Sequence, residues 1–153
     1  MKIEITKEAF DPWYEIQQYQ TFSKLKQGEY GATSVFVGTM RDFNAGSHIK
    51  AMELEHYPEM TEKKLAEVVN ETLLKWSLID ILLVHRVGMV FPNDPIVLVA
   101  AWSSHRGDAF DGSRYIMEAL KSKVPFWKKE VLVSDTERWV EKNTDGYLHE
   151  NSD

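Results

Sequence analysis

Cysteine is absent from the 153 residues of the chain. Its absence excludes a disulfide framework, a thiolate metal site and a cysteine nucleophile. No apolar run approaches the length needed to cross a bilayer. The first residues, MKIEITKEAF, contain no apolar segment of the kind found in secretory signals. We therefore expect a cytoplasmic protein that does not bind a membrane.

Several well-known nucleotide, hydrolase and metal-binding motifs are also missing. The sequence contains no P-loop, no G-x-G-x-x-G, no G-x-S-x-G and no H-E-x-x-H. His56 and His85 each lie inside a strand pattern without a partner at metal-ligand spacing, so a hydrogen-bonded core or surface position is the simpler interpretation. We predict that the protein holds no metal and no cofactor.

Charge is distributed unevenly along the chain. The net charge of −6 opposes a whole-surface nucleic-acid binder. Residues 121–129, KSKVPFWKK, nevertheless hold four lysines and no acidic residue. This lysine segment could concentrate a small anion or an acidic peptide. Its aromatic pair, Phe126 and Trp127, leaves single-stranded RNA binding as a weaker alternative.

Hydrophobic periodicity predicts an α+β protein, because strands and helices follow one another without regular βαβ alternation. We expect one domain over residues 1–142 and a polar tail over residues 143–153. An antiparallel hairpin is predicted at FPNDP, residues 91–95, and a loop at RDFNAGS, residues 41–47. Strands are predicted at residues 2–6, 31–40, 49–57, 80–88, 96–102, 126–133 and 137–141, and helices at 12–25, from 61 to about 76, and 106–123.

The helix boundaries rest on capping residues and prolines. Asp11 and Pro12 form an N-cap and first-turn pair. Thr61 opens the clearest amphipathic pattern, and Ser104 is the expected N-cap of the last helix. Pro125 ends that helix, because a proline disfavours helical geometry in the residue before it.

Lys121 and Lys128 are the first candidates for chemistry. Lys121 shares one face of its predicted helix with Met117 and Phe110. A lysine beside apolar groups loses hydration, so its pKa should fall toward a range useful for acid–base or nucleophilic work. For any one lysine considered alone, solvation near a helix C-terminus is the more common outcome. The residues alone leave both interpretations open.

A second candidate site lies at residues 103–106, SSHR, where a buried strand leads into a helix. Unpaired amides at a helix start attract anions, and Arg106 adds a forked donor while His105 can donate a proton. An ordinary capped helix start with an exposed His-Arg pair explains the same residues equally well. Arg41 follows a strand end on a flexible loop, where binding groups are frequent, although a solvated arginine is the commoner case.

Taken together, these segments resemble the large, catalytic subunit of molybdopterin synthase. The resemblance runs in order from Gly31 to Glu141. It is carried by VFVG with M-R-x-x-N-x-G, LEHYPEMTEK, HRVG, SSHR, KSKVPFWKKE and ERWVE. Thr39-Met40 depart from the Lys-Val that relatives often have before Arg41. The resemblance implies an α/β-hammerhead-like fold, with a mixed, largely antiparallel sheet packed against two main helices, in a dimeric protein.

The resemblance also implies a function. Members of this family insert two sulfurs into cyclic pyranopterin monophosphate and so form the dithiolene of molybdopterin. The sulfur arrives as a thiocarboxylate on the C-terminal Gly-Gly of a small ubiquitin-like subunit, and a homodimer of large subunits forms the core of a heterotetramer. The functional positions carry over onto Arg41, His105, Arg106, Lys121 and Lys128, with Phe36, Met117 and Lys129 in the surrounding pocket.

Two physical arguments extend the resemblance. A chain without cysteine cannot carry sulfur as a persulfide, so it needs an external sulfur donor. Arg106 and Lys121 are separated by about 22 Å along one predicted helix, so a single substrate cannot touch both. We therefore expect a site at a two-fold interface, with Lys121, Lys128 and Arg41 from one subunit and His105 and Arg106 from the other.

Overall fold

The computed structural model describes residues 1–141, which form two β-sheets and three helices. The expected polar tail, residues 143–153, lies outside the described residues. The α+β class is confirmed. The elements are β1 (Lys2–Thr6), α1 (Pro12–Phe22), β2 (Ala32–Thr39), β3 (Phe43–Asn44), β4 (Ser47–His56), α2 (Pro58–Lys75), β5 (Leu78–Arg86), β6 (Gly88–Val90), β7 (Pro95–Ser103), α3 (Arg106–Ser122), β8 (Phe126–Leu132) and β9 (Glu137–Trp139).

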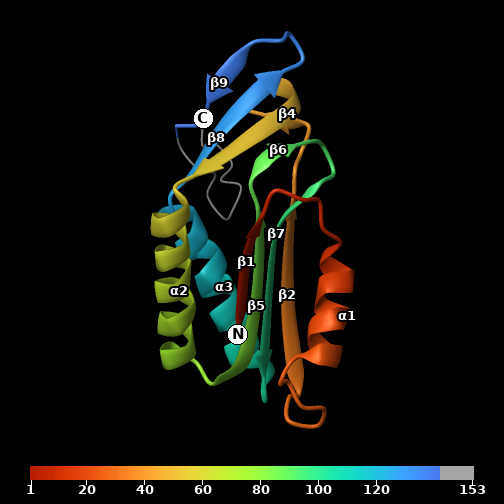
Figure 1. Ribbon diagram of the computed structural model, residues 1–153, viewed down its shortest axis with the longest axis vertical. Helices are drawn as coiled ribbons and strands as arrows, with labels where there is room; N and C mark the ends of the chain where they lie inside the picture. The colour runs from red at the N-terminus through yellow and green to blue at the C-terminus, as the bar shows by residue number, and fades with distance from the viewer. Residues whose placement is uncertain (142–153) are drawn as a thin grey trace, which may run out of the picture.

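The first sheet has the order β1-β5-β7-β2, with β1 parallel to β5 and the other pairs antiparallel. Figure 1 shows α2 and α3 along one face of this sheet and α1 along the other. Ile81 and Leu83 of β5 pack toward α2 and α3, whereas Leu82 and Val84 pack toward α1. Burial on both faces explains why β5 and β7 are continuous apolar runs.

The second sheet has the order β3-β4-β8-β9, with β6 paired to β4, and lies at one end of the molecule (Figure 1). It has its own small core, in which Met52 and Leu54 of β4 contact Val90 of β6. The antiparallel pairing of β5 with β7 across residues 91–95 is confirmed. The sequence did not reveal that β6 leaves that hairpin to join the second sheet.

Several boundaries differ from the sequence prediction. Helix α1 ends at Phe22, and α2 begins at Pro58 rather than Thr61, since proline suits the first helical turn. The N-cap of α3 is His105, not Ser104, and no side chain caps it. The predicted loop 41–47 contains the two-residue strand β3, which turns back through Ala45 and Gly46, both at positive φ.

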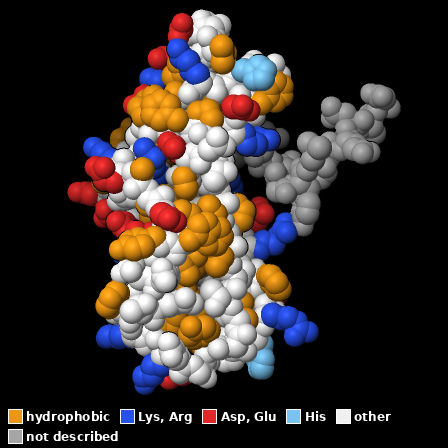
Figure 2. All heavy atoms as spheres, turned by 90° about the vertical axis from the view of Figure 1, so that its right-hand side faces the viewer, with side chains coloured by type: hydrophobic (Ala, Val, Ile, Leu, Met, Phe, Trp, Pro, Cys, Tyr) orange, Lys and Arg blue, Asp and Glu red, His pale blue; other side chains and the backbone are white. Residues whose placement is uncertain are grey.

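Helix α1 packs one side against the first sheet and leaves several large aromatic side chains exposed. The Asp11 carboxylate accepts hydrogen bonds from the backbone N–H groups of Trp13 and Tyr14, which confirms the predicted cap. Trp13, Tyr14 and Phe22 remain exposed. Figure 2 shows hydrophobic side chains gathered in patches on the side of the molecule where α1 lies. Among residues 1–141, no helix has the length and apolar character required to span a bilayer.

Candidate active site

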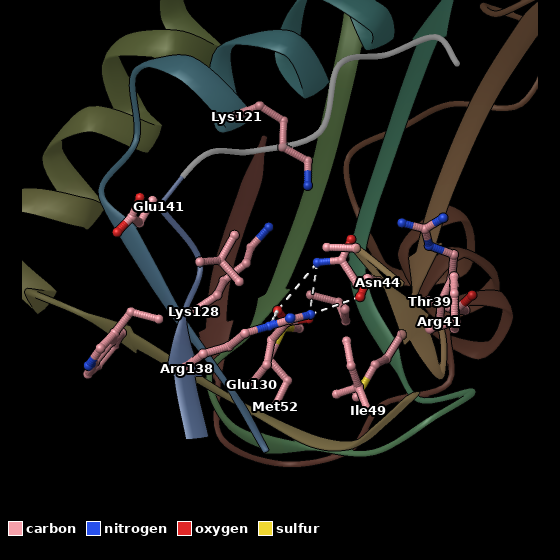
Figure 3. A pocket seen from close by; sticks show the side chains of 16 residues that line it. Thr39, Arg41, Asn44, Ile49, Met52, Lys121, Lys128, Glu130, Arg138 and Glu141 are labelled. Carbon is pink, nitrogen blue, oxygen red and sulfur yellow. Dashed lines mark hydrogen bonds and ion pairs between the residues drawn. The ribbon is translucent and has the colours of Figure 1, made fainter. Parts of the chain in front are cut away.

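A cavity of about 670 Å³ opens beside the second sheet and is bordered by residues from both sheets and from α3. Arg41 and the β3–β4 hairpin form one side of it, and β8 and β9 form another (Figure 3). Lys121 enters from α3 and Lys128 from β8, and Figure 3 shows both side chains directed into this space. Arg41, Lys121 and Lys128 therefore border one cavity, although Arg41 is far from the two lysines in the sequence.

A smaller cavity of about 120 Å³ adjoins the first and is mostly apolar. Phe36 of β2, Met117 of α3 and Phe126 of β8 contribute to its lining. Lys121 and Lys128 border both cavities. We call the larger space the outer cavity and the smaller one the inner cavity. The two ammonium groups thus lie where a ligand in one space would meet a ligand in the other.

The local sequence explains how the two lysines come together. Lys121 lies in the last turn of α3, and Pro125 prevents the helix from continuing. The chain then reverses directly into β8, which returns Lys128 to the same region. Burial, together with the charge and hydrogen bond of Lys121, lowers the pKa of Lys128 to about 8. At pH 7 about a tenth of the Lys128 side chains are therefore uncharged.

Glu130 forms the anionic part of the outer cavity. Its side chain is 4% exposed and accepts a hydrogen bond from Arg138 Nε at 3.0 Å and one from Asn44 Nδ2 at 3.1 Å. Arg138 also donates to the backbone carbonyl of Asn44 at 2.8 Å (Figure 3). This clamp, formed by Asn44, Glu130 and Arg138, ties the β3–β4 hairpin to β8 and β9. It therefore fixes the wall that carries Arg41.

Sequence reasoning missed the Asn44–Glu130–Arg138 clamp. Lys128 and Glu130 alternate on one face of β8, and that period-two spacing was available in the sequence. Nothing in the sequence, however, indicated that Asn44 and Arg138 would lie opposite Glu130, because these contacts join distant segments. Among residues 1–141, no group of three or more His, Asp or Glu side chains could hold a metal ion.

Three of the candidate residues lie outside both cavities. Lys129 points away from Lys128, since neighbouring strand residues face opposite sides. Its ammonium pairs with Glu53 at 3.3 Å and Glu137 at 3.7 Å. His105 and Arg106 are exposed at the opposite end of α3 from Lys121. The single helix predicted between Arg106 and Lys121 is confirmed, so one chain cannot bring its own His105 and Arg106 to its lysine pair.

Comparison with known proteins identifies the family of the chain. The family model described as "MoaE protein" matches residues 5–123. The chain belongs to the MoaE family. The molybdopterin synthase catalytic subunit of Haemophilus influenzae is 43% identical over 141 residues, which cover 92% of this chain and 90% of that protein.

Two further relatives extend the comparison. The molybdopterin synthase catalytic subunit of Ralstonia nicotianae is 53% identical over 113 residues; the match covers 74% of this chain and 64% of that longer protein. The crystal structure of molybdopterin synthase from Staphylococcus aureus superposes with a TM-score of 0.79 at 37% identity, covering 92% of this chain and 98% of that chain. The MoaE fold thus extends over nearly all of the chain, including the second sheet that bears Lys128.

Proposed function

We propose that this MoaE protein is the catalytic subunit of molybdopterin synthase. It transfers sulfur from the C-terminal thiocarboxylate of a small ubiquitin-like subunit to cyclic pyranopterin monophosphate and forms the dithiolene of molybdopterin. The observation that carries the proposal is the position of Lys121 and Lys128 at the boundary of the inner and outer cavities. The family membership and the names of the relatives support the same function.

The two cavities differ in the ligands that they suit. The inner cavity is narrow and mostly apolar, which suits an extended Gly-Gly tail without side chains. The outer cavity has room for a pterin, and Arg41 offers a forked donor for its phosphate. A tail in the inner cavity and a substrate in the outer cavity would place the thiocarboxylate between the two lysines.

Each transfer leaves sulfur on the substrate and a carboxylate on the tail. A carbon–sulfur bond forms on the substrate as a carbon–oxygen bond there breaks. The acyl carbon–sulfur bond of the tail also breaks, and a water oxygen takes the place of sulfur on the acyl carbon. We assign Lys121 the acid–base or nucleophilic role in this step. Lys128 holds the developing negative charge or the carboxylate of the tail, since a cation in a desolvated position stabilises an anion strongly.

A second copy of the chain completes the proposed site. His105 and Arg106 of one subunit would bind the phosphate and the pterin at the lysine pair of the other, which makes the homodimer the core of a heterotetramer. The length of α3 supports the need for a second copy, because it separates Arg106 from Lys121 by about 22 Å in one chain. Phe36 and Met117 shape the inner cavity.

Reconstitution tests the function directly. The chain is mixed with a thiocarboxylated small subunit and cyclic pyranopterin monophosphate, and the dithiolene product is measured. Product is expected at a rate comparable to that of a known synthase. Salt-sensitive binding of the small subunit without product would instead indicate a module that only recognises an acidic peptide tail.

Four expectations stay predictions beside this function. They are a cytoplasmic location, a single domain over residues 1–142 with a polar tail, a place for Lys129 around the pocket, and no binding of nucleic acid. Cell fractionation tests the location, and limited proteolysis tests the division into domain and tail. Assaying a Lys129→Ala variant tests the role of Lys129, and filter binding of single-stranded RNA at physiological salt tests nucleic-acid binding.

A further inference from the structure

His85 is a buried polar group at the inner cavity for which the mechanism above has no role. It lies on β5, is 7% exposed and borders the inner cavity. The sequence favoured a hydrogen-bonded core or surface position, and the structure shows a buried one, in which Nδ1 lies 2.8 Å from the backbone carbonyl oxygen of Arg86. One face of the ring stacks on Phe126, with ring centroids 3.9 Å apart and planes at 7°. His85 and Phe126 both border the inner cavity, so the stacked pair forms part of its wall.

The hydrogen bond to Arg86 fixes which ring nitrogen carries the proton. A carbonyl oxygen can only accept, so Nδ1 donates and a neutral ring presents Nε2 as an acceptor. Burial, opposed by the Arg86 hydrogen bond and reinforced by the charges of Lys128, Lys121 and His56, lowers the pKa of His85 to about 4. The imidazole is therefore uncharged at neutral pH.

The inner cavity needs such an acceptor if it holds a peptide. Its polar side chains are those of Thr39, His85, Lys121 and Lys128, and all but His85 also border the outer cavity. The charged lysines can only donate hydrogen bonds. They suit the carbonyl oxygens and the terminal anion of a tail but cannot accept from a peptide N–H. The Thr39 hydroxyl can accept, but Thr39 also borders the outer cavity, so His85 is the acceptor side chain that borders the inner cavity alone. A peptide N–H left unpaired in an apolar cavity loses its hydrogen bond to water without replacement, which weakens binding.

We propose that His85 is a positioning residue for the tail of the small subunit, accepting a hydrogen bond at Nε2 from the last peptide N–H. The inference rests on the proposed function. This contact fixes how far the tail enters, so that the thiocarboxylate stops between Lys121 and Lys128. It also favours a tail with a free N–H at that position, which excludes proline there.

A double-mutant cycle on binding tests the inference. The full chain and its His85→Phe variant are titrated with the small subunit in its carboxylate form, once with the normal last peptide bond and once with that bond replaced by an ester. Phenylalanine retains a ring to stack on Phe126 but has no acceptor, and the ester removes the N–H alone. Isothermal titration calorimetry gives the four dissociation constants.

Each single change should weaken binding by about tenfold, and the two together should weaken it no further than one alone. Independent, additive losses would overturn the inference, as would unchanged binding by His85→Phe. His56→Phe is the matched control. His56 also stacks with Phe126, at 6.4 Å, but does not border the inner cavity, so its variant should keep the full loss on ester replacement. If the unaltered chain does not bind the unmodified small subunit, the proposed function fails and this inference with it.

Discussion

Lys128 and Glu130 lie on one face of β8 and both border the outer cavity, yet they act on the site in opposite ways. Burial and the charge of Lys121 lower the pKa of Lys128, and the Glu130 carboxylate raises it by less. The resulting pKa is about 8. The lysine is thus mostly charged at neutral pH but can release its proton at modest cost. A group with that property can stabilise an anion and also exchange a proton during turnover.

Removing either neighbour should move the pKa of Lys128 in a predictable direction. Lys121→Met removes a like charge and should raise it, while Glu130→Gln removes an opposite charge and should lower it. NMR titration of the lysine side-chain resonances, assigned with Lys128→Met, measures both shifts. A titration curve of Lys128 that neither substitution moves would contradict the coupling.

The lowered pKa of Lys128 also predicts a pH-dependent stability. The pKa is about 8 in the folded chain and 10.5 for an ordinary lysine, so between these pH values the unfolded chain binds more protons and stability rises with pH. Below pH 8 the lysine is protonated in the folded chain as well, and the destabilisation of the folded chain by this buried charge is at its maximum. Lys128→Met should therefore raise the free energy of unfolding at pH 7 by on the order of 1 kcal/mol. Urea denaturation of both proteins at pH 7 and pH 10 should show this gain shrinking at the higher pH.

The Asn44–Glu130–Arg138 clamp should matter for stability as well as for the shape of the site. Glu130→Gln leaves Arg138 opposite a neutral group in a buried position and should cost about 2 kcal/mol. Glu137→Gln is a matched control, because that carboxylate is 57% exposed and solvent screens its pair with Lys129, so the substitution should change stability little. Thermal and chemical denaturation compare the two. Equal losses from both variants would show that the clamp does not stabilise the fold.

Local patterns predicted the elements well, and tertiary contacts account for what they missed. The continuous apolar runs of β5 and β7 predicted strands buried on both faces, and Pro125 predicted the end of α3. The parallel pairing of β1 with β5, the departure of β6 to the second sheet and the position of Glu130 opposite Asn44 and Arg138 depend on distant segments. For His85 the sequence favoured a hydrogen-bonded core or surface position, and only the packing of Phe126 against it shows that it is buried beside the inner cavity.

The lysine pair should be essential for turnover. Lys121→Ala and Lys128→Ala should each lower kcat by about 10²–10⁴-fold, and arginine at either position should also fail, since its charge cannot be released and its shape differs. Lys123→Ala is the control from the same segment. Its ammonium lies near Glu71 and the ring of Tyr115, away from both cavities, so its variant should keep near-normal kcat. Normal turnover by Lys121→Ala with intact binding of the small subunit would refute the assignment.

Mixed dimers can show whether the site crosses two subunits. Lys121→Ala and Arg106→Ala chains carrying different tags are produced together, and dimers containing one of each are isolated by two affinity steps. If Lys121 of one subunit works with Arg106 of the other, one of the two sites is intact and activity should be about half of the unaltered dimer, although each variant alone is inactive. A dimer of Lys121→Ala with Lys128→Ala should stay inactive, because both lysines belong to the same half of the site. Inactivity of the first mixed dimer would place Arg106 and Lys121 in separate functions, because the length of α3 does not allow one chain to bring them together.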